Sequence, residues 1–260
     1  MTGTMTSSRI AETFERCKAE NRAALVPFLT CGYPTPEMTA PLLDAIAAGG
    51  ADLVEIGVPF SDPLADGTTV QAASQRALDA GVTLGDCLEL VRGFRARGGT
   101  IPVLLMGYTN PFYQYGLERL AEDAAAAGVD GFLIPDLPSD ESDEFLEPFA
   151  RHGLVLVQFL APTSTERRIA DVAARATGFI YCVSLVGVTG ARSEMSDELP
   201  EYIARVRAKT DLPLTIGFGI STPDHVRAAA KLADGVVVAS ALLNHIDTLP
   251  QDEQVAGAEA

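Results

Sequence analysis

The sequence contains few of the residues that carry covalent or metal-assisted chemistry. Its three lysines, Lys18, Lys209 and Lys231, fall in stretches of helical period and not at predicted strand ends, which disfavours a Schiff-base mechanism. The three histidines are widely separated and lack the spacing of metal ligands, so metal-assisted chemistry is also disfavoured. No Gly-x-Ser-x-Gly motif or Cys/His pairing indicates acyl transfer.

Positive charge is scarce as well. Nineteen lysines and arginines face 35 acidic residues, for a formal net charge of −16. This balance argues against nucleic-acid binding, where phosphate is held by Lys and Arg, and against an anionic membrane surface. It does not exclude a small phosphorylated ligand, because backbone amides and helix N-termini can hold phosphate without net positive charge.

Signals for secretion or membrane insertion are also missing. Residues 1–9 are rich in Thr and Ser and have no apolar core of a signal peptide. No apolar run approaches the roughly 18–20 residues of a membrane helix. The four cysteines form no Cys-x-x-Cys motif. Together these features predict a cytoplasmic protein with reduced thiols.

Apolar runs alternate with Ala/Leu/Glu/Arg-rich stretches along the whole chain. The expected strands are residues 24–30, 52–57, 102–107, 131–135, 154–160, 179–184, 212–217 and 235–239. The expected helices include residues 37–48, 71–80, 84–97, 117–127, 166–176, 199–209 and 224–232. The strand runs are nearly continuous in apolar residues, as in parallel strands that are covered on both faces.

Eight such units predict a (β/α)8 TIM barrel, with residues 1–260 as one domain. An extra N-terminal helix over 8–18 would close the barrel bottom, and residues 1–8 and about 250–260 are expected to be disordered tails. The rival fold is a doubly wound open sheet. That fold usually carries Gly-x-Gly-x-x-Gly after its first strand, where this chain reads Thr30-Cys-Gly-Tyr-Pro34.

The segment from Asp52 to Gly67 is the strongest candidate for chemistry. It places Glu55 inside an apolar strand, and the loop that follows holds Asp62 and Asp66. A buried charge costs several kcal/mol unless it is paired or neutralised. A glutamate in this position, next to an acidic loop, therefore indicates acid–base catalysis.

Small residues at three later strand ends predict a phosphate site. They are the segments 187–190 and 217–219 and the pair Ala239-Ser240. Their N–H groups can approach an anion closely, and Ser240 opens the final helix, whose dipole favours negative charge. Phosphate in a TIM barrel commonly sits beyond the last two strands.

Five motifs resemble those of the tryptophan synthase alpha chain family. They are Leu25-Val-Pro-Phe-Leu-Thr with Gly32-Tyr-Pro, Glu55-Ile-Gly-Val-Pro-Phe-Ser-Asp-Pro-Leu-Ala-Asp-Gly67, Pro135-Asp-Leu-Pro138, Gly187-Val-Thr-Gly-Ala-Arg192 and Gly217-Phe-Gly-Ile-Ser221. The similarity spans about residues 10–246, with the motifs in order. It implies a TIM-barrel lyase that cleaves indole-3-glycerol phosphate to indole and glyceraldehyde 3-phosphate.

The resemblance also implies roles for individual residues. Glu55 would be the acid–base carboxylate, and Asp66 would bind the indole N–H and stabilise positive charge on the ring. The substrate pocket and phosphate site would be lined by Phe28, Tyr181, Thr189, Gly190, Phe218, Gly219, Ala239 and Ser240. Tyr181 could equally serve only to pack the barrel. Asp136 could be a turn residue or a partner of the catalytic loop, which is the segment after the second strand that holds Asp62 and Asp66. Asp62 would lie on the side of this loop that faces a partner subunit.

The implied partner is a tryptophan synthase beta chain in an α2β2 complex. The alpha chain would need neither cofactor nor metal, and pyridoxal phosphate would belong to the beta chain. Two alternatives stay open: a stand-alone lyase that releases indole, and a weakly active alpha chain that only activates a beta chain. Ala239 where the family has Gly, Thr68 where it has Pro, Leu185-Val186 where polar residues are common, and an early chain end depart from the family pattern.

Overall fold

The computed structural model describes residues 8–184, 198–217 and 219–259. Eight parallel strands form a closed barrel in sequence order, with β8 hydrogen-bonded to β1. The strands are β1 Ala24–Thr30, β2 Val54–Gly57, β3 Val103–Met106, β4 Gly131–Leu133, β5 Val155–Leu160, β6 Ile180–Val183, β7 Leu214–Gly217 and β8 Gly235–Val238. The predicted TIM barrel is therefore confirmed, and the open sheet is excluded.

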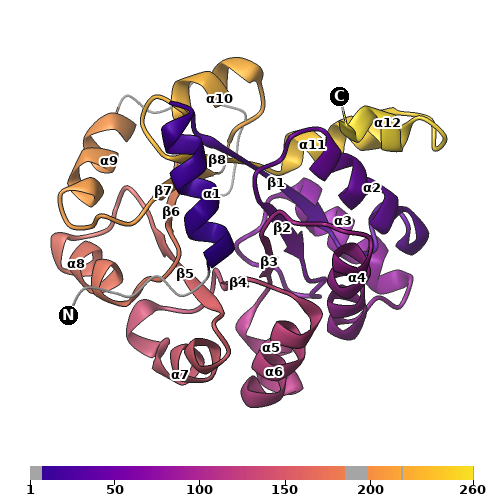
Figure 1. Cartoon of the computed structure of the whole chain (residues 1–260), viewed down its shortest axis with the longest axis horizontal. Coiled ribbons are helices and arrows are strands. Elements are labelled where there is room, and N and C mark those ends of the chain that lie inside the picture. Colours follow the sequence, from indigo (N-terminus) through magenta and orange to yellow (C-terminus); the bar gives the residue numbers. More distant parts are fainter. Residues whose placement is uncertain (1–7, 185–197, 218, 260) are drawn as a thin grey trace.

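Helices surround the barrel (Figure 1). They are α1 Ser8–Ala19, α2 Pro36–Ala48, α3 Thr68–Asp79, α4 Leu84–Ala96, α5 Thr109–Tyr115, α6 Leu117–Ala127, α7 Asp143–Arg151, α8 Glu166–Arg175, α9 Leu199–Arg207, α10 Pro223–Ala229, α11 Ser240–Thr248 and α12 Gln254–Glu259, with a 3-10 turn at Ser139–Glu141. Local signals explain several ends. Thr83 and Asp86 form a capping box at the start of α4, and Gly128 ends α6 with φ of +87°.

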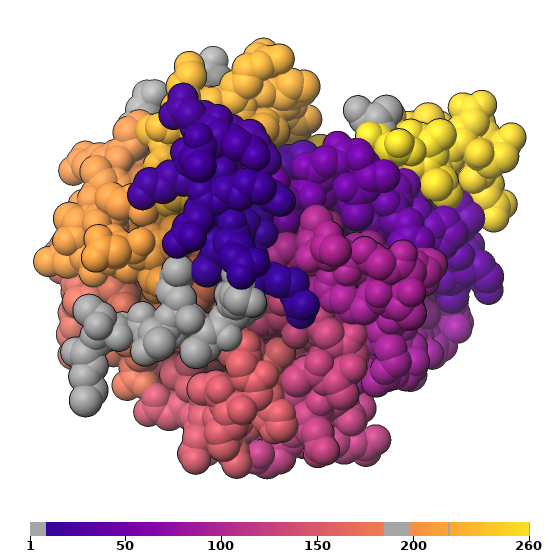
Figure 2. Space-filling model, in the orientation of Figure 1, coloured from indigo at the N-terminus to yellow at the C-terminus, as the bar shows by residue number. Residues whose placement is uncertain are grey.

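Helix α1 lies across the barrel bottom, as the sequence predicted. Figures 1 and 2 show it in indigo over the centre of this face. Its side chains Ile10, Phe14 and Cys17 are buried among the inward-facing residues of the barrel. The rings of Phe14 and Phe179 lie 5.5 Å apart. The helix therefore closes the barrel and leaves the opposite end of the strands free for chemistry.

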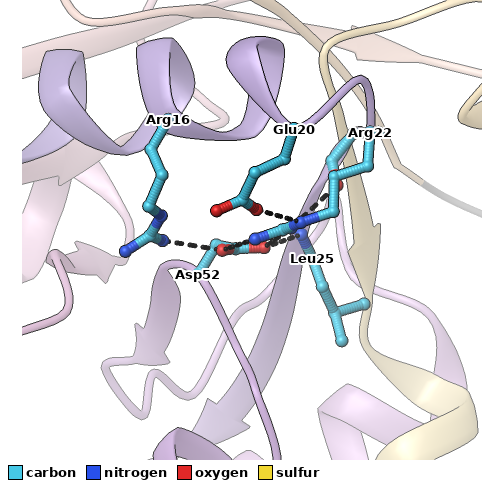
Figure 3. Close-up of polar contacts among 6 residues, drawn as sticks. Arg16, Glu20, Arg22, Leu25 and Asp52 are labelled. Carbon is cyan, nitrogen blue, oxygen red and sulfur yellow. Dashed lines mark hydrogen bonds and ion pairs between the residues drawn. The ribbon is translucent and has the colours of Figure 1, made fainter.

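A buried aspartate fixes α1 to the barrel (Figure 3). Asp52 is 2% exposed and accepts hydrogen bonds from Arg16 Nη2 at 2.8 Å, Arg22 Nη1 at 2.6 Å and the Leu25 backbone N–H at 2.9 Å. Arg22 also donates to Glu20 Oε2 at 2.7 Å. Burial by itself would raise the pKa of Asp52, but the hydrogen bonds from Arg22 and Leu25 outweigh it and lower the pKa.

Similar hydrogen bonds recur around the bottom of the barrel, at the N-terminal ends of the strands. A polar side chain just before each even-numbered strand accepts the backbone N–H of a residue in the preceding odd-numbered strand. The donor–acceptor distances are Leu25 N to Asp52 2.9 Å, Val103 N to Asp130 2.8 Å, Leu156 N to Thr177 2.9 Å and Leu214 N to Asp234 2.8 Å. Each bond satisfies a backbone donor at the beginning of a strand.

The C-terminus differs from the sequence expectation. The chain was expected to fray from Pro250, but residues 254–259 form α12, which lies beside α2 (Figure 1). Gln254 is buried and donates to Ile246 O at 3.2 Å, while Val255 and Ala258 pack against the hydrophobic core. An acidic, Gly-containing composition suggested disorder, and tertiary packing overrides it.

Two further helices, α5 and α7, were not expected from the sequence. Helix α5 contains Pro111, and α7 contains Pro148. Proline disfavours helix interiors, but Pro111 lies in the first turn of α5, where its missing N–H would be unpaired anyway, whereas Pro148 lies inside α7. Within the described ranges, no helix combines the length and apolarity needed to cross a lipid bilayer.

We expect Asp52→Asn to lower the free energy of unfolding by about 2–3 kcal/mol at neutral pH. Removing one partner of a fully buried ion pair costs about 3–5 kcal/mol, and here the arginines are half exposed. Urea denaturation would measure the change. The control is Asp44→Asn, whose exposed pair with Arg97 should contribute less than about 1 kcal/mol. Equal losses for the two variants would refute the special role of Asp52.

The Asp52 contribution should also depend on pH. Because its folded-state pKa is lowered, the stabilisation is complete above the unfolded pKa of about 3.9 and disappears as the pH falls through the folded value. The gap between wild type and Asp52→Asn should therefore close at acid pH. A gap that stays constant down to the acid transition would contradict this assignment.

Candidate functional site

Glu55 lies in the middle of β2 and points into the barrel. Its Cα is in register with Phe28 of β1 and Leu104 of β3. The side chain is 1% exposed, and burial raises its pKa to about 8. Its Oε1 has no hydrogen-bond partner among the described residues. A carboxyl group in this environment is largely protonated at neutral pH and can donate a proton or take one back.

Asp66 lies in the loop between β2 and α3, directly before Gly67, which caps α3. The side chain is 6% exposed. Burial raises its pKa, a hydrogen bond with Tyr108 lowers it, and the result is about 6. Asp66 is therefore mostly ionised at neutral pH, whereas Glu55 is mostly protonated. Two carboxyl groups with separated pKa values can act as acid and base at the same pH.

Tyr181 of β6 lies near both carboxyl groups. It is 4% exposed, and its pKa is raised first by burial and then by the negative charges of Glu55 and Asp66. Both carboxyl groups therefore act on one tyrosine. The ring packs against Phe159, with centroids 4.8 Å apart. The structure brings all three predicted residues, Glu55, Asp66 and Tyr181, into the same region of the barrel.

Two glycines make room for the aromatic side chains of this region. A Cβ on Gly217 would lie 1.8 Å from Tyr181 Oη, and a Cβ on Gly57 would lie 2.4 Å from Phe28 Cζ. Both distances are far below van der Waals contact, so a larger residue at either position would displace the aromatic side chain. Phe28, another predicted residue, is 3% exposed and covers Gly57, two positions from Glu55 on the same strand.

The structure describes only some of the residues that were predicted to bind phosphate. Gly219 is exposed and has φ of +74°. Ala239 directly precedes α11, and Ser240 is its first residue, so the positive end of the helix dipole lies at Ser240. Strands β7 and β8, which lead to these residues, are paired. Thr189, Gly190, Phe218 and the pair Leu185-Val186 lie outside the described residues.

Tyr108 and Thr109 were not predicted, although they follow β3 and so occupy a strand end. The Tyr108 hydroxyl accepts a hydrogen bond from the Ala65 backbone N–H at 2.9 Å. Thr109 donates to Asp136 Oδ1 through its N–H at 2.9 Å and its hydroxyl at 3.0 Å. Asp136 is therefore a loop-fixing acceptor after β4. Its position after a strand was a usable signal, whereas the Tyr108 contact joins residues remote in sequence.

Two other observations concern metal binding and the location of the site. Among the described residues, no group of three or more His, Cys, Asp and Glu side chains is placed to hold a metal ion. A hollow of about 400 Å³ lies outside the barrel, lined by the loop residues Gly32 and Val82 and by residues of α2 and α4, such as Thr39 and Leu90. It contains neither Glu55 nor Asp66, so the paired carboxyl groups and not this hollow define the candidate site.

Comparison with known proteins places this geometry in one family. A family model described as tryptophan synthase alpha chain matches residues 14–260. The tryptophan synthase alpha chain of Roseiflexus sp. (strain RS-1) is 55% identical over 251 residues, covering 96% of each chain. That of Chloroflexus aurantiacus is 52% identical over 253 residues, covering 97% of this chain and 95% of the relative.

Solved structures agree with the sequence relatives. Tryptophan synthase subunit alpha from Legionella pneumophila str. Paris has a TM-score of 0.89 and 36% identity, with 97% of this chain and 95% of that chain covered. A chain of tryptophan synthase from M. tuberculosis in its aminoacrylate-bound form has a TM-score of 0.87 and 34% identity, with 97% and 98% covered. The similarity therefore extends through the whole barrel.

We expect Gly217→Ala to displace the Tyr181 ring and to lower the free energy of unfolding by about 1–3 kcal/mol, as overpacking does. Urea denaturation and near-UV circular dichroism would measure both effects. The control is Gly85→Ala, where the new methyl group would be 3.4 Å from Thr83 Oγ1 in ordinary contact. If Gly217→Ala left stability and spectrum unchanged, the close approach of Tyr181 would be wrong.

The pKa of Glu55 predicts a pH dependence of stability. Because the folded-state value of about 8 exceeds the unfolded value of about 4.3, folding binds a proton, and stability falls as the pH rises between these values. Glu55→Gln lacks this proton and should gain stability over wild type as the pH increases from 5 to 8. Urea denaturation across that range, with exposed Glu122→Gln as control, measures it. Parallel curves would contradict the raised pKa.

Proposed function

This chain belongs to the tryptophan synthase alpha chain family, and from that premise we propose that Glu55 and Asp66 carry out its reaction. The activity is the lyase reaction on indole-3-glycerol phosphate, which yields indole and glyceraldehyde 3-phosphate. The observation that supports the proposal most is the separation of the two pKa values, to about 8 and about 6, in one buried region.

The proposed mechanism uses Glu55 twice. The protonated Glu55 donates its proton to C3 of the indole, and the ring nitrogen takes the positive charge. The carboxylate so formed removes the proton of the neighbouring glycerol hydroxyl. The carbon–carbon bond then breaks, its electron pair returns to the ring, and the hydroxyl oxygen becomes the aldehyde carbonyl. Glu55 ends protonated, so one residue completes the cycle without an external acid or base.

Asp66 has the complementary role. In its ionised form it accepts a hydrogen bond from the indole N–H and stabilises the positive charge that develops during C3 protonation. The protonated indole is the electron sink, which in other aldol cleavages is a lysine Schiff base or a metal ion. This division of labour requires Glu55 to be protonated and Asp66 to be charged at the same pH, as their burial and hydrogen bonding provide.

The remaining residues would hold the two ends of the substrate. Phe28 and Tyr181 would pack against the indole ring, because both are buried aromatic side chains beside the carboxyl groups. Gly219, Ala239 and Ser240 would bind the phosphate at the start of α11, with its helix dipole. Thr189, Gly190 and Phe218 are proposed for the same pocket from the family resemblance alone.

The partner is a tryptophan synthase beta chain, and we propose an α2β2 complex. The alpha chain would work without a cofactor, and pyridoxal phosphate would belong to the beta chain. The four cysteines are free and buried, which fits the reducing cytoplasm. The whole chain 1–260 is proposed to act as one domain.

We expect Glu55→Gln to abolish cleavage of indole-3-glycerol phosphate, because the amide can neither donate nor accept the shuttled proton. Asp66→Asn should reduce kcat by about 10²-fold or more, as loss of a positioned charged group does. Indole release measured with purified beta chain would test both, with exposed Glu122→Gln as the control variant. Wild-type turnover by Glu55→Gln would refute the mechanism.

The same assay distinguishes three possible functions: an α2β2 enzyme, a stand-alone lyase and an activator of the beta chain. Strong activation of the isolated chain by beta chain supports the α2β2 enzyme, and full activity without beta chain supports a stand-alone lyase. Activation of the beta reaction by a chain that itself turns over no substrate would support the activator.

A further inference from the structure

Tyr108 lies against the catalytic loop, residues 58–67 between β2 and α3, at Phe60, Ala65 and Asp66. Its ring packs against Phe60, with centroids 5.3 Å apart. Its hydroxyl accepts the Ala65 N–H at 2.9 Å, and it lies close enough to the Asp66 side chain to lower the pKa of that carboxyl group. Phe60 lies near the beginning of the loop after β2, and Asp66 lies at its end. One side chain from β3–α5 therefore contacts the loop at both ends.

Tyr108 is itself firmly held. It is 4% exposed, and the next residue, Thr109, is fixed by two hydrogen bonds to Asp136 Oδ1. Asp136 follows β4, so the anchor connects the ends of β3 and β4 to the loop after β2. Strand ends of a closed barrel are rigid reference points. A group attached to them can position a loop side chain more tightly than contacts within the loop can.

The internal contacts of the loop are local by comparison. The backbone bonds Leu64 N–H to Asp62 O and Asp66 N–H to Pro63 O are turns within the loop, and Ser61 and Asp62 bond to each other at the surface. Outside the loop, Gln71 Nε2 donates to the Asp66 backbone carbonyl at 2.9 Å. Among the described contacts, Tyr108 thus ties the end of the loop, at the residue before Asp66, to the end of a neighbouring strand.

We propose that Tyr108 is a positioning residue for the reaction: anchored through Thr109 to Asp136, it holds the loop so that the Asp66 carboxylate faces the substrate. The inference rests on the proposed function of Asp66. The hydroxyl lowers the pKa of Asp66 and so favours its ionisation, which a group that only packs against the loop would not do.

Several ionisable groups face Asp66 and enter the expected pH behaviour. Tyr108 comes from the β3–α5 loop and Tyr181 from β6, and Asp66 acts electrostatically on both. Glu55 of β2 also acts on Tyr181, and Asp136 acts on Tyr108. Neither carboxyl group is removed by a change at Tyr108. A shift on substitution of that residue therefore reports the lost hydroxyl.

The test is Tyr108→Phe, which keeps the ring contact with Phe60 and removes the hydroxyl. We expect kcat/KM at pH 7 to fall roughly tenfold, mainly through kcat, because the loop loses its hydrogen bond at Ala65 and Asp66 loses the hydroxyl that favours its ionisation. The acid limb of the pH–rate profile should move up by about one pH unit, because Asp66 then protonates more readily. The matched control is Tyr113→Phe, an exposed tyrosine of α5 that bonds Glu144.

A second readout does not depend on activity. The ¹³C-carboxyl resonance of Asp66, titrated in the substrate-free chain, should have its midpoint at higher pH in Tyr108→Phe than in wild type or Tyr113→Phe. An unchanged midpoint and an unmoved acid limb would overturn the inference while leaving the lyase function intact. Loss of the function itself would appear differently, as a wild-type chain with no turnover in the presence of beta chain.

Discussion

The site depends on one constraint: the Glu55 carboxyl group is buried inside the barrel, and no cation among the described residues offsets that burial. Burial shifts the pKa of Glu55 to about 8, and the described residues provide Oε1 with no hydrogen bond. Such a group costs stability in any fold. The closed barrel, plugged below by α1 and tied by Asp52 and its three equivalents, provides a scaffold stable enough to carry that cost.

The second carboxyl group is controlled in the opposite way. Asp66 is also buried, but the nearby Tyr108 hydroxyl limits the rise of its pKa. One acidic residue on a rigid strand and one on a loop held by a neighbouring strand end thus reach different protonation states at one pH. Glycines complete the arrangement, because Gly217 and Gly57 let Tyr181 and Phe28 lie directly against the strands. Geometry and protonation are therefore set by the same few contacts.

The sequence predicted the barrel well because strand and helix signals are local. Continuous apolar runs located all eight strands, although several ends moved by a few residues. Thr165 and Thr222 cap α8 and α10, two of the helices that the sequence predicted. The prediction failed at the C-terminus, where α12 forms only because it can pack on α2 and bury Gln254. Local composition carries no information about such a remote partner.

By itself the sequence determined the fold class and the candidacy of Glu55 and Asp66, because apolar periodicity and a carboxylate in a strand are properties of neighbouring residues. The tertiary structure alone decided which residues surround those groups. Tyr108 reaches Asp66 across 42 positions of sequence, and Tyr181 meets both carboxyl groups from the far side of the barrel. Desolvation and hydrogen bonding depend on these neighbours in space, so the pKa values that make the chemistry feasible arise only on folding.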